Sequence, residues 1–217
     1  MRSPSRRRRG AALLVVVVVL AGLLVSADVV ARRLAEDELA ARVKGAVPSA
    51  ATTSAQLRSF PFLARLLVSG DVSELDAAVG NVTVQGLRFA SIAVDLHGVR
   101  VDRDQLVRDR RVVLQKIDRG RVEARVTSEA LTEALGVPVS LEQGRASVTI
   151  AGRTLGAELE VENGRLVVGV AGFSLPAIHV TAPLLPCVAN ARIVPGVVLL
   201  TCDFTEIPKE LRTPAQL

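Results

Sequence analysis

The residues of this chain that could do chemistry are few and far apart. A hydrolytic triad needs a nucleophile, a base and an orienting acid, but the sequence has two histidines, His97 and His179, and no Gly-x-Ser-x-Gly turn. Each histidine falls where a strand end or turn is expected, which does not suit a base. Clustered His or Cys for zinc and glycine loops for phosphate are also absent from the sequence. We therefore predict no metal ion, no cofactor and no enzymatic activity.

Paired carboxylates occur in three places. Asp102 and Asp104 have the spacing of two calcium ligands, but no further oxygen-rich loop follows them. The acids of residues 36–38 fall on the polar side of a predicted helix, and those of residues 158–162 alternate along one predicted strand. Both patterns are typical of faces exposed to solvent, so paired-carboxylate catalysis is not indicated.

The N-terminus has the charge pattern of an export signal. A basic cluster of five arginines precedes an uncharged stretch of 18 residues, 10–27, and Asp28 follows. Val25 and Ala27 are the small residues that a signal peptidase needs, so we predict cleavage after Ala27. An uncleaved anchor is the alternative, because 18 residues lie at the lower limit for crossing a bilayer. Residues 1–27 are thus a signal peptide or signal anchor, and residues 28–217 form one extracytoplasmic domain, in the periplasm or cell envelope.

Charge and composition of the exported part exclude one class of partner. The whole chain has 27 basic and 22 acidic residues, and the signal segment holds five of the basic ones, so the remainder has 22 of each. A neutral domain without Trp or Tyr has neither the basic face nor the stacking surfaces that nucleic-acid binding needs. We predict no nucleic-acid partner.

Two cysteines, Cys187 and Cys202, are the only ones in the sequence. No C-x-x-C motif and no basic neighbour is present to lower a thiol pKa, so a redox site is disfavoured. The segment between them has Pro195-Gly196 near its middle and predicts a hairpin. With residues 193–196 as the loop, Cys187 lies opposite Cys202, which predicts a structural disulfide in an exported protein.

The remaining patterns predict an α+β fold. An amphipathic helix follows Ala27, with Asp28 as a possible cap and a stop before Pro48, and its apolar residues are expected to pack on a sheet: Val30, Leu34, Leu39, Val43 and Val47. Mixed charge signs disfavour a membrane-surface role for this helix. Period-two patterns begin at Leu75 and change phase at Gly80-Asn81 and at Gly98, which indicates a long, curved antiparallel sheet with bulges or bends.

Turn signals complete this reading of the chain. A short helix is predicted from Ser128, its N-cap, to Gly136, and hairpin turns are predicted at Ala151-Gly152 and Asn163-Gly164. The order is helix, meander, helix, meander, with the Cys187 to Cys202 hairpin last. We expect a single domain in which a long curved antiparallel sheet wraps around the N-terminal helix.

The segment "SFPFLARLLVSGDVSELDAAVGNVTVQGLRFASIAVDLHGVRVD" resembles a known family. The Phe-Pro-Phe-Leu motif, the Leu-rich turn ending at Ser69-Gly70 and the strand ending in Leu-x-Gly-Val are similar to the LmeA-like family of actinobacterial cell-envelope proteins, formerly a domain of unknown function. The segment "LPCVANARIVPGVVLLTC" resembles the ending of one branch of that family.

This resemblance implies phospholipid binding, a fold similar to tubular lipid-binding proteins, and a periplasmic role in the maturation of lipoglycans. It implies no catalytic residues. Our leading hypothesis is an exported, non-enzymatic protein that carries or presents phospholipid, or a related acyl lipid, at a membrane surface for envelope assembly. The alternative is an exported structural or interaction module that supports an envelope enzyme such as a glycosyltransferase.

Five residues are candidates for lipid contact: Phe60, Phe62, Leu63, Leu66 and Leu67. Phe60 and Phe62 flank Pro61 in a chain with five Phe in total. One hypothesis is that they anchor the loop between helix and sheet, with the leucines closing the core. The other is that this segment forms the mouth or wall of a lipid-binding gutter. Both hypotheses can hold together.

Overall fold

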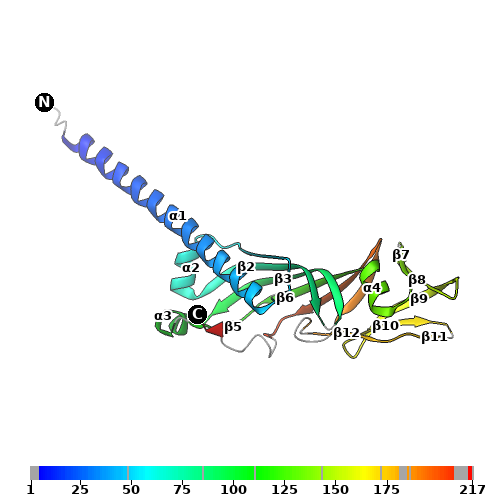
Figure 1. Ribbon diagram of the computed structural model, residues 1–217. Helices are drawn as coiled ribbons and strands as arrows, with labels where there is room; N and C mark the ends of the chain where they lie inside the picture. The colour runs from blue at the N-terminus through cyan, green and yellow to red at the C-terminus, as the bar shows by residue number, and fades with distance from the viewer. Residues whose placement is uncertain are drawn as a thin grey trace.

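A long N-terminal helix, two antiparallel sheets and three short helices make up the described part of the chain (Figure 1). The computed structural model describes residues 5–47, 49–84, 86–109, 111–142, 144–171, 173–180, 185, 187–207 and 215–216. The helices are α1 (Ser5–Ala46), α2 (Phe62–Ser69), α3 (Arg103–Asp109) and α4 (Ser128–Leu135).

The larger sheet has the strand order β1-β2-β3-β6-β14-β13, with β5 pairing to the end of β3. Its strands are β1 (Thr52–Leu57), β2 (Asp71–Val84), β3 (Leu87–Val101), β5 (Leu114–Lys116), β6 (Arg119–Thr127), β13 (Asn190–Val194) and β14 (Val197–Phe204). Every pairing is antiparallel, and β1 and β13 remain its edges, so the sheet does not close.

The smaller sheet has the order β11-β10-β9-β8-β7, with β12 also pairing to β10. Its strands are β7 (Val139–Glu142), β8 (Arg145–Ile150), β9 (Arg153–Glu162), β10 (Arg165–Val170), β11 (Phe173–Ser174) and β12 (Ile178–His179). β4 (Arg111–Val112) and β15 (Ala215–Gln216) pair separately. The predicted α+β class with an N-terminal helix and antiparallel sheets is confirmed, although the strands divide between two main sheets.

Local turn chemistry explains most of the short elements. The predicted hairpin turns at Ala151-Gly152 and Asn163-Gly164 are present, and all four residues have positive φ angles between 48° and 77°. This is the geometry of the tight turns that join twisted strands. The predicted short helix is α4, but its N-cap is Thr127 and not Ser128, because the Thr127 hydroxyl accepts a hydrogen bond from the Ala130 amide at 3.3 Å.

The long strands β2 and β3 bend where the sequence pattern changes phase. Asn81 and Gly98 have φ angles of 50° and 61°. The pairing register is the same before and after each of them, so no extra residue is inserted and both sites are bends. After Gly98 the buried position moves from Leu96 to Val99, which keeps apolar side chains on the inner face.

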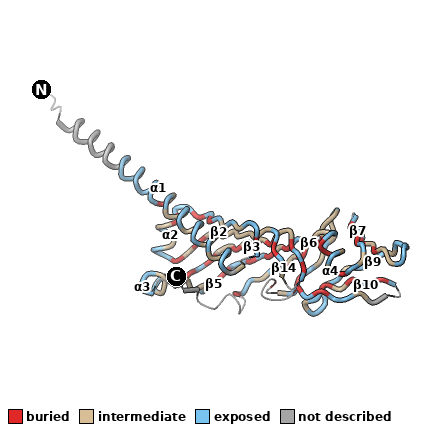
Figure 2. Tube along the Cα trace, in the orientation of Figure 1, coloured by how far each residue is buried: buried red, intermediate tan, exposed pale blue. Residues whose placement is uncertain are grey.

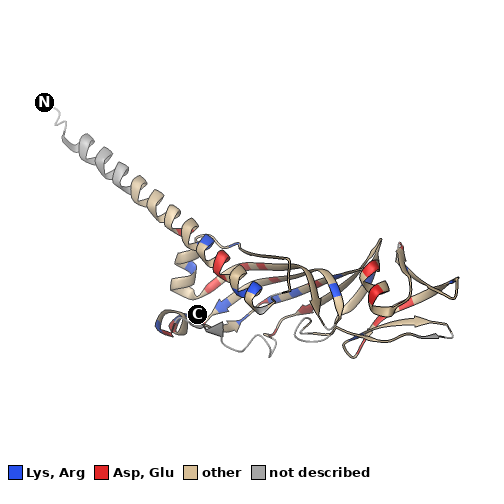
Figure 3. Ribbon diagram, in the orientation of Figure 1, with Lys and Arg blue, Asp and Glu red and all other residues tan. Residues whose placement is uncertain are grey.

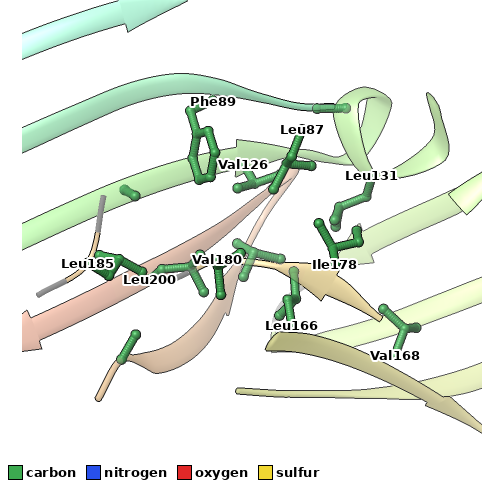
Figure 4. Close-up of a cluster of buried hydrophobic side chains, with 14 of the residues drawn as sticks. Leu87, Phe89, Val126, Leu131, Leu166, Val168, Ile178, Val180, Leu185 and Leu200 are labelled. Carbon is green, nitrogen blue, oxygen red and sulfur yellow. The ribbon is translucent and has the colours of Figure 1, made fainter. Parts of the chain in front are cut away.

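The buried side chains form two cores. Figure 2 marks the buried residues in red along the chain. The larger core lies between the two sheets and α4, and its fully buried side chains include Phe89, Leu131, Leu166 and Leu200 (Figure 4). The smaller core lies at the other end of the larger sheet, beneath α1 and α2, and is built from these buried residues: Leu57, Phe62, Val72, Leu96, Val99, Val101, Ile117 and Ile207.

Helix α1 differs from the sequence expectation in two ways. It continues through Asp28 without interruption, so Asp28 does not cap it, and its N-terminal half projects away from the sheets (Figure 1). The face that packs on the domain contains Ala35 and Leu39, whereas Val30 and Leu34 of the predicted apolar stripe are exposed. Among the residues whose side chains the structure describes, which in α1 begin at Val18, no helical segment is both long enough and apolar enough to cross a membrane.

The C-terminal hairpin contains the predicted disulfide in a different register. Cys187 and Cys202 are bonded, with their Cα atoms 5.7 Å apart. The hairpin loop is the two residues Pro195-Gly196, since Val194 pairs with Val197, and not the predicted four-residue loop. The register is therefore shifted by two residues. Cys187 lies before the start of β13, and the disulfide ties that preceding segment to β14.

Candidate functional site

Helix α2 is held in place at its N-terminus by a side chain from α1. Its own N-cap residue is Pro61, which provides no side-chain hydrogen bond. The Asp28 carboxylate accepts hydrogen bonds from the Phe62 amide at 3.0 Å and from the Leu63 amide at 2.7 Å, and Asp28 is buried. The negative charge of Asp28 also interacts favourably with the positive end of the α2 dipole. Asp28 therefore fixes α2 against α1.

The other end of α2 is fixed to the sheet by a glycine. Gly70 has a φ angle of 73° and donates its amide to the Leu66 carbonyl at 3.1 Å. Its own carbonyl accepts a hydrogen bond from the Val101 amide at 2.9 Å. A Cβ at residue 70 would collide with the Val101 carbonyl oxygen. Only glycine therefore allows α2 to end this close to β3.

Helix α1 is fastened to the larger sheet by a second carboxylate on the same face. Glu36, eight residues after Asp28, accepts a hydrogen bond from the Leu57 amide of β1 at 2.8 Å. Arg32 lies between them, with its Nε 3.8 Å from a Glu36 oxygen. Asp28, Arg32 and Glu36 thus align on the face of α1 that contacts the domain.

An apolar cavity of about 230 Å³ lies between α1, α2 and the larger sheet. Ala35 and Leu39 of α1 form one wall, and Phe62 and Leu66 of α2 form another. The floor consists of sheet residues, and the remaining side comes from α3, β4 and β5: Leu57, Val72, Leu75, Val99 and Val101, then Leu106, Val112 and Leu114. The cavity therefore joins the smaller core to the outside between these elements.

The cavity lining contains only two charged residues, Glu38 and Arg42 of α1. The Arg42 Nε donates to a Glu38 carboxylate oxygen at 3.0 Å, which pairs the two along the helix. The lining is otherwise aliphatic or aromatic. This arrangement suits an apolar chain in the interior with a polar group beside α1.

The five candidate residues fall into two groups in the structure. Phe62 is buried and lines the cavity with Leu66, and Leu63 packs against the smaller core. Phe60 and Leu67 lie outside the cavity, with 67% and 52% of their surfaces exposed. The structure therefore places Phe62, Leu63 and Leu66 on the inner side of α2, and Phe60 and Leu67 on its outer side.

Sequence reasoning missed the cavity residues that α1 contributes and the role of Asp28. Leu39 was expected to pack on a sheet, but Ala35 was not identified because the stripe was assigned around Val30 and Leu34. A signal for Asp28 is present, since it is the first charged residue after the uncharged stretch. In Figure 3 the described part of α1 is drawn without charged residues until it nears the domain, which agrees with the uncharged sequence 10–27.

A second hollow, of about 1070 Å³, is more polar. It lies on the smaller sheet and is lined by hydroxyl and charged side chains such as Ser147, Thr149, Thr154 and Arg145. Among the described residues, no group of three or more His, Cys, Asp or Glu could hold a metal ion. This second hollow offers no apolar interior comparable to the cavity beside α2.

One carboxyl pair on the larger sheet has a perturbed titration. Asp95 of β3 lies directly opposite Asp76 of β2. Partial burial, and after it the negative charge of Asp76, raises the pKa of Asp95 above its ordinary value. Neither residue lines the apolar cavity. This pair affects stability and gives no sign of a catalytic role.

Comparison with known proteins assigns the family. The sequence model of a family described as LmeA-like phospholipid-binding matches residues 26–197. The chain belongs to the LmeA-like phospholipid-binding family. The match begins two residues before Asp28 and includes α2, the bent strands and the smaller sheet. No curated protein and no solved structure matches the chain.

Proposed function

We propose that this LmeA-like protein is exported and non-enzymatic, and that it carries or presents phospholipid for assembly of the cell envelope, including its lipoglycans. The supporting observation is the apolar cavity beside α2 in a chain of a phospholipid-binding family. At about 230 Å³ it is smaller than a typical ligand site of roughly 300–1,000 Å³. It therefore holds part of an acyl chain, while the rest of the lipid stays outside.

The proposed location is outside the cytoplasmic membrane. The five arginines and the uncharged stretch 10–27 support export, and the disulfide supports an oxidising compartment. The lipid-binding unit is residues 28–217, and its proposed partners are phospholipid, a membrane surface and an envelope enzyme such as a glycosyltransferase. Residues 1–27 either are removed or anchor the protein.

Photo-crosslinking of lipid to the whole chain tests this function. The chain is reconstituted in phosphatidylglycerol and phosphatidylethanolamine vesicles that contain a phospholipid with a photoactivatable acyl chain. Crosslinked peptides are then identified by mass spectrometry. We expect crosslinks at the cavity residues Leu39, Leu66 and Val99. The variant Ala35→Phe should reduce them several-fold because its ring fills the cavity.

Ala41→Phe is the matched control, because it makes the same change on the exposed side of α1. It should leave the crosslinks at wild-type level. Retention of the Cys187–Cys202 disulfide and of protease resistance shows that each variant is folded. If both variants give the wild-type pattern, or if no crosslink reaches the cavity residues, lipid carriage is wrong.

The second candidate function is an exported interaction module that supports an envelope enzyme. The packed larger core and the exposed apolar side chains around α2 favour it. Crosslinking again distinguishes the two functions. A module of this kind would give protein crosslinks from Phe60, Leu67 or Val68 to a glycosyltransferase in cells, with no lipid crosslink at Leu66.

A further inference from the structure

The outer side of α2 presents apolar side chains to solvent. Phe60, Leu67 and Val68 are 67%, 52% and 74% exposed, and Val107 of the neighbouring helix α3 is 62% exposed. We call these four residues the apolar tip. The cavity is on the opposite side of α2, so the tip is not needed to build it. Apolar residues gathered at one end of a domain mark an interaction site.

The two polar side chains of α2, Arg65 and Ser69, are exposed and lie one turn apart on one side of the helix. Ser69 donates its hydroxyl to the Arg65 carbonyl at 2.9 Å, and Arg65 donates to the Ser73 hydroxyl. The remaining six residues of α2 are apolar. Apart from this polar strip the outer side of α2 is apolar, and an exposed apolar face of this kind usually meets protein or lipid. Only the inner side of α2 is covered by protein here.

Helices α2 and α3 form one connected surface. Arg103 at the start of α3 donates to the Val68 carbonyl at 3.2 Å, and Arg100 pairs with Asp71 at 2.9 Å just after α2. The Arg100 guanidinium, followed by the Ser69 hydroxyl, holds the pKa of Asp71 below its ordinary value. The charges of Arg100 and Asp71 beside the tip are thus paired with each other.

The path of α1 identifies what covers the tip. Residues 10–27 are uncharged, and at about 1.5 Å per residue they span roughly 27 Å, close to the hydrocarbon thickness of a bilayer. A bilayer that holds this segment therefore has Asp28 at its surface. Asp28 hydrogen-bonds the first amides of α2, so α2 lies at the same depth. The outer side chains of α2 then meet lipid.

We infer that the apolar tip is a bilayer-docking surface, which inserts Phe60, Leu67, Val68 and Val107 into the outer leaflet beside α1. Docking places the cavity at the membrane surface, where an acyl chain can enter it without crossing water. The purpose of docking rests on the proposed function, but docking itself does not require that the cavity bind lipid.

Depth-dependent fluorescence quenching in the whole chain tests this surface. Single cysteines replace Phe60, Val68 or Val107, the two native cysteines being protected in their disulfide. Each is labelled with an environment-sensitive dye in phosphatidylglycerol and phosphatidylethanolamine vesicles containing spin-labelled lipid. We expect quenching about threefold stronger than at Arg153→Cys, an exposed position at the start of β9 in the smaller sheet. Equal quenching at all four sites would overturn the inference.

A charged variant separates docking from simple tethering by α1. Phe60→Asp with Val68→Asp should abolish most of the quenching of a label at residue 107, because charge is costly to insert. Leu34→Asp, at an exposed apolar position of α1, should not. If the double variant keeps the quenching, tethering explains it and docking is wrong. A change in dye emission that increases with protein concentration in the absence of lipid would indicate that a second copy of the chain covers the tip. This result would also overturn docking.

The two proposals fail in distinguishable ways. Ala35→Phe should remove crosslinks in the cavity while leaving the quenching at residue 107 unchanged. Phe60→Asp with Val68→Asp should remove the quenching while Leu66 can still be crosslinked by lipid supplied in solution. If the unmodified chain gives quenching at residue 107 but no cavity crosslinks, lipid carriage is wrong, and if it gives cavity crosslinks without that quenching, docking is wrong.

Discussion

At the scale of single residues, Asp28 is the contact on which the position of α2 depends. It satisfies two amides that no residue of α2 can satisfy, since Pro61 precedes the helix. No periodicity analysis could predict this, because the partner amides lie 34 and 35 residues away. The sequence identified Phe62 and Leu66 as candidates because they are apolar residues of one segment. It could not tell these inner residues from Phe60 and Leu67, which lie on the outer side of α2.

We predict that Asp28→Ala loosens α2. Loss of the carboxylate leaves the Phe62 and Leu63 amides without their partner, which should cost about 1–2 kcal/mol of unfolding free energy. Amide hydrogen exchange of the α2 peptide should become faster. Asp37→Ala, an exposed acid on the same helix, should leave that exchange unchanged. Equal exchange in both variants would show that Asp28 does not hold α2.

Asp95 predicts a pH dependence of stability. Its pKa is raised in the folded state, so the folded protein keeps a proton that the unfolded chain releases above its ordinary value of 3.8. The resulting stability is present at lower pH and is lost as pH rises through the raised pKa. Asp95→Asn should therefore raise the thermal midpoint at about pH 7 and leave it unchanged at about pH 3.

Asp203→Asn is the opposite-sign control for that measurement. Hydrogen bonding to Arg121, with Nε 2.7 Å from one carboxylate oxygen, lowers the pKa of Asp203. Its contribution is present above the ordinary value and is lost as pH falls, so this variant should lower the midpoint at about pH 7. A shared direction of change in the two variants would contradict the assigned charge environments.

At the scale of elements, helix ends and tight turns were the most predictable features. Asn163-Gly164 and the stop at Gly136 follow from local backbone needs, and both are confirmed. The docked face of α1 and the hairpin register were not, because they depend on distant partners. Val30 and Leu34 fit the helical spacing of an apolar stripe as well as the residues that pack on the domain do. The hydrogen bonds of Asp28 and Glu36 to the domain decide the orientation, so the face with Ala35 and Leu39 packs inward.

We predict that Gly70→Ala is more destabilising than Gly136→Ala. Both glycines end a helix with φ near 70°, and placing alanine there costs about 1 kcal/mol. Gly136 has open space for the new methyl group, whereas at Gly70 it meets the Val101 carbonyl. Urea denaturation of both variants isolates this collision. Equal urea midpoints would mean that β3 moves away from the new methyl group without loss of unfolding free energy.

The disulfide gives a second prediction at this scale. It closes a segment with a sequence separation of 15, for which loop closure predicts about 3 kcal/mol. Cys202→Ser should be more destabilising than Cys187→Ser, because Cys202 is fully buried in the larger core whereas Cys187 is partly exposed. Denaturant midpoints under oxidising conditions compare them. A larger loss in Cys187→Ser would contradict this assignment of burial.

At the scale of the whole molecule, the chain separates a packed core from a ligand-accessible one. The larger core, between the two sheets, holds the largest fully buried side chains, such as Phe89 and Leu131, whereas the smaller core at the opposite end of the larger sheet has the cavity beside it. The bends at Asn81 and Gly98 keep one continuous sheet across both regions. Antiparallel curvature was predictable from the phase changes, but which end of the sheet stays open depends on how α1 and α2 pack.

The unbroken course of α1 also bears on how the protein matures. A peptidase that cuts after Ala27 must act on extended chain, but in the folded protein residues on both sides of that bond are helical, and Asp28 is bonded to α2. Cleavage and folding then compete in time. If cleavage occurs as proposed, a chain that is cut before α2 docks would be released, and a chain that folds first would keep residues 1–27. One sequence would then yield a released form and a membrane-held form with the same cavity, in a ratio set by the two rates.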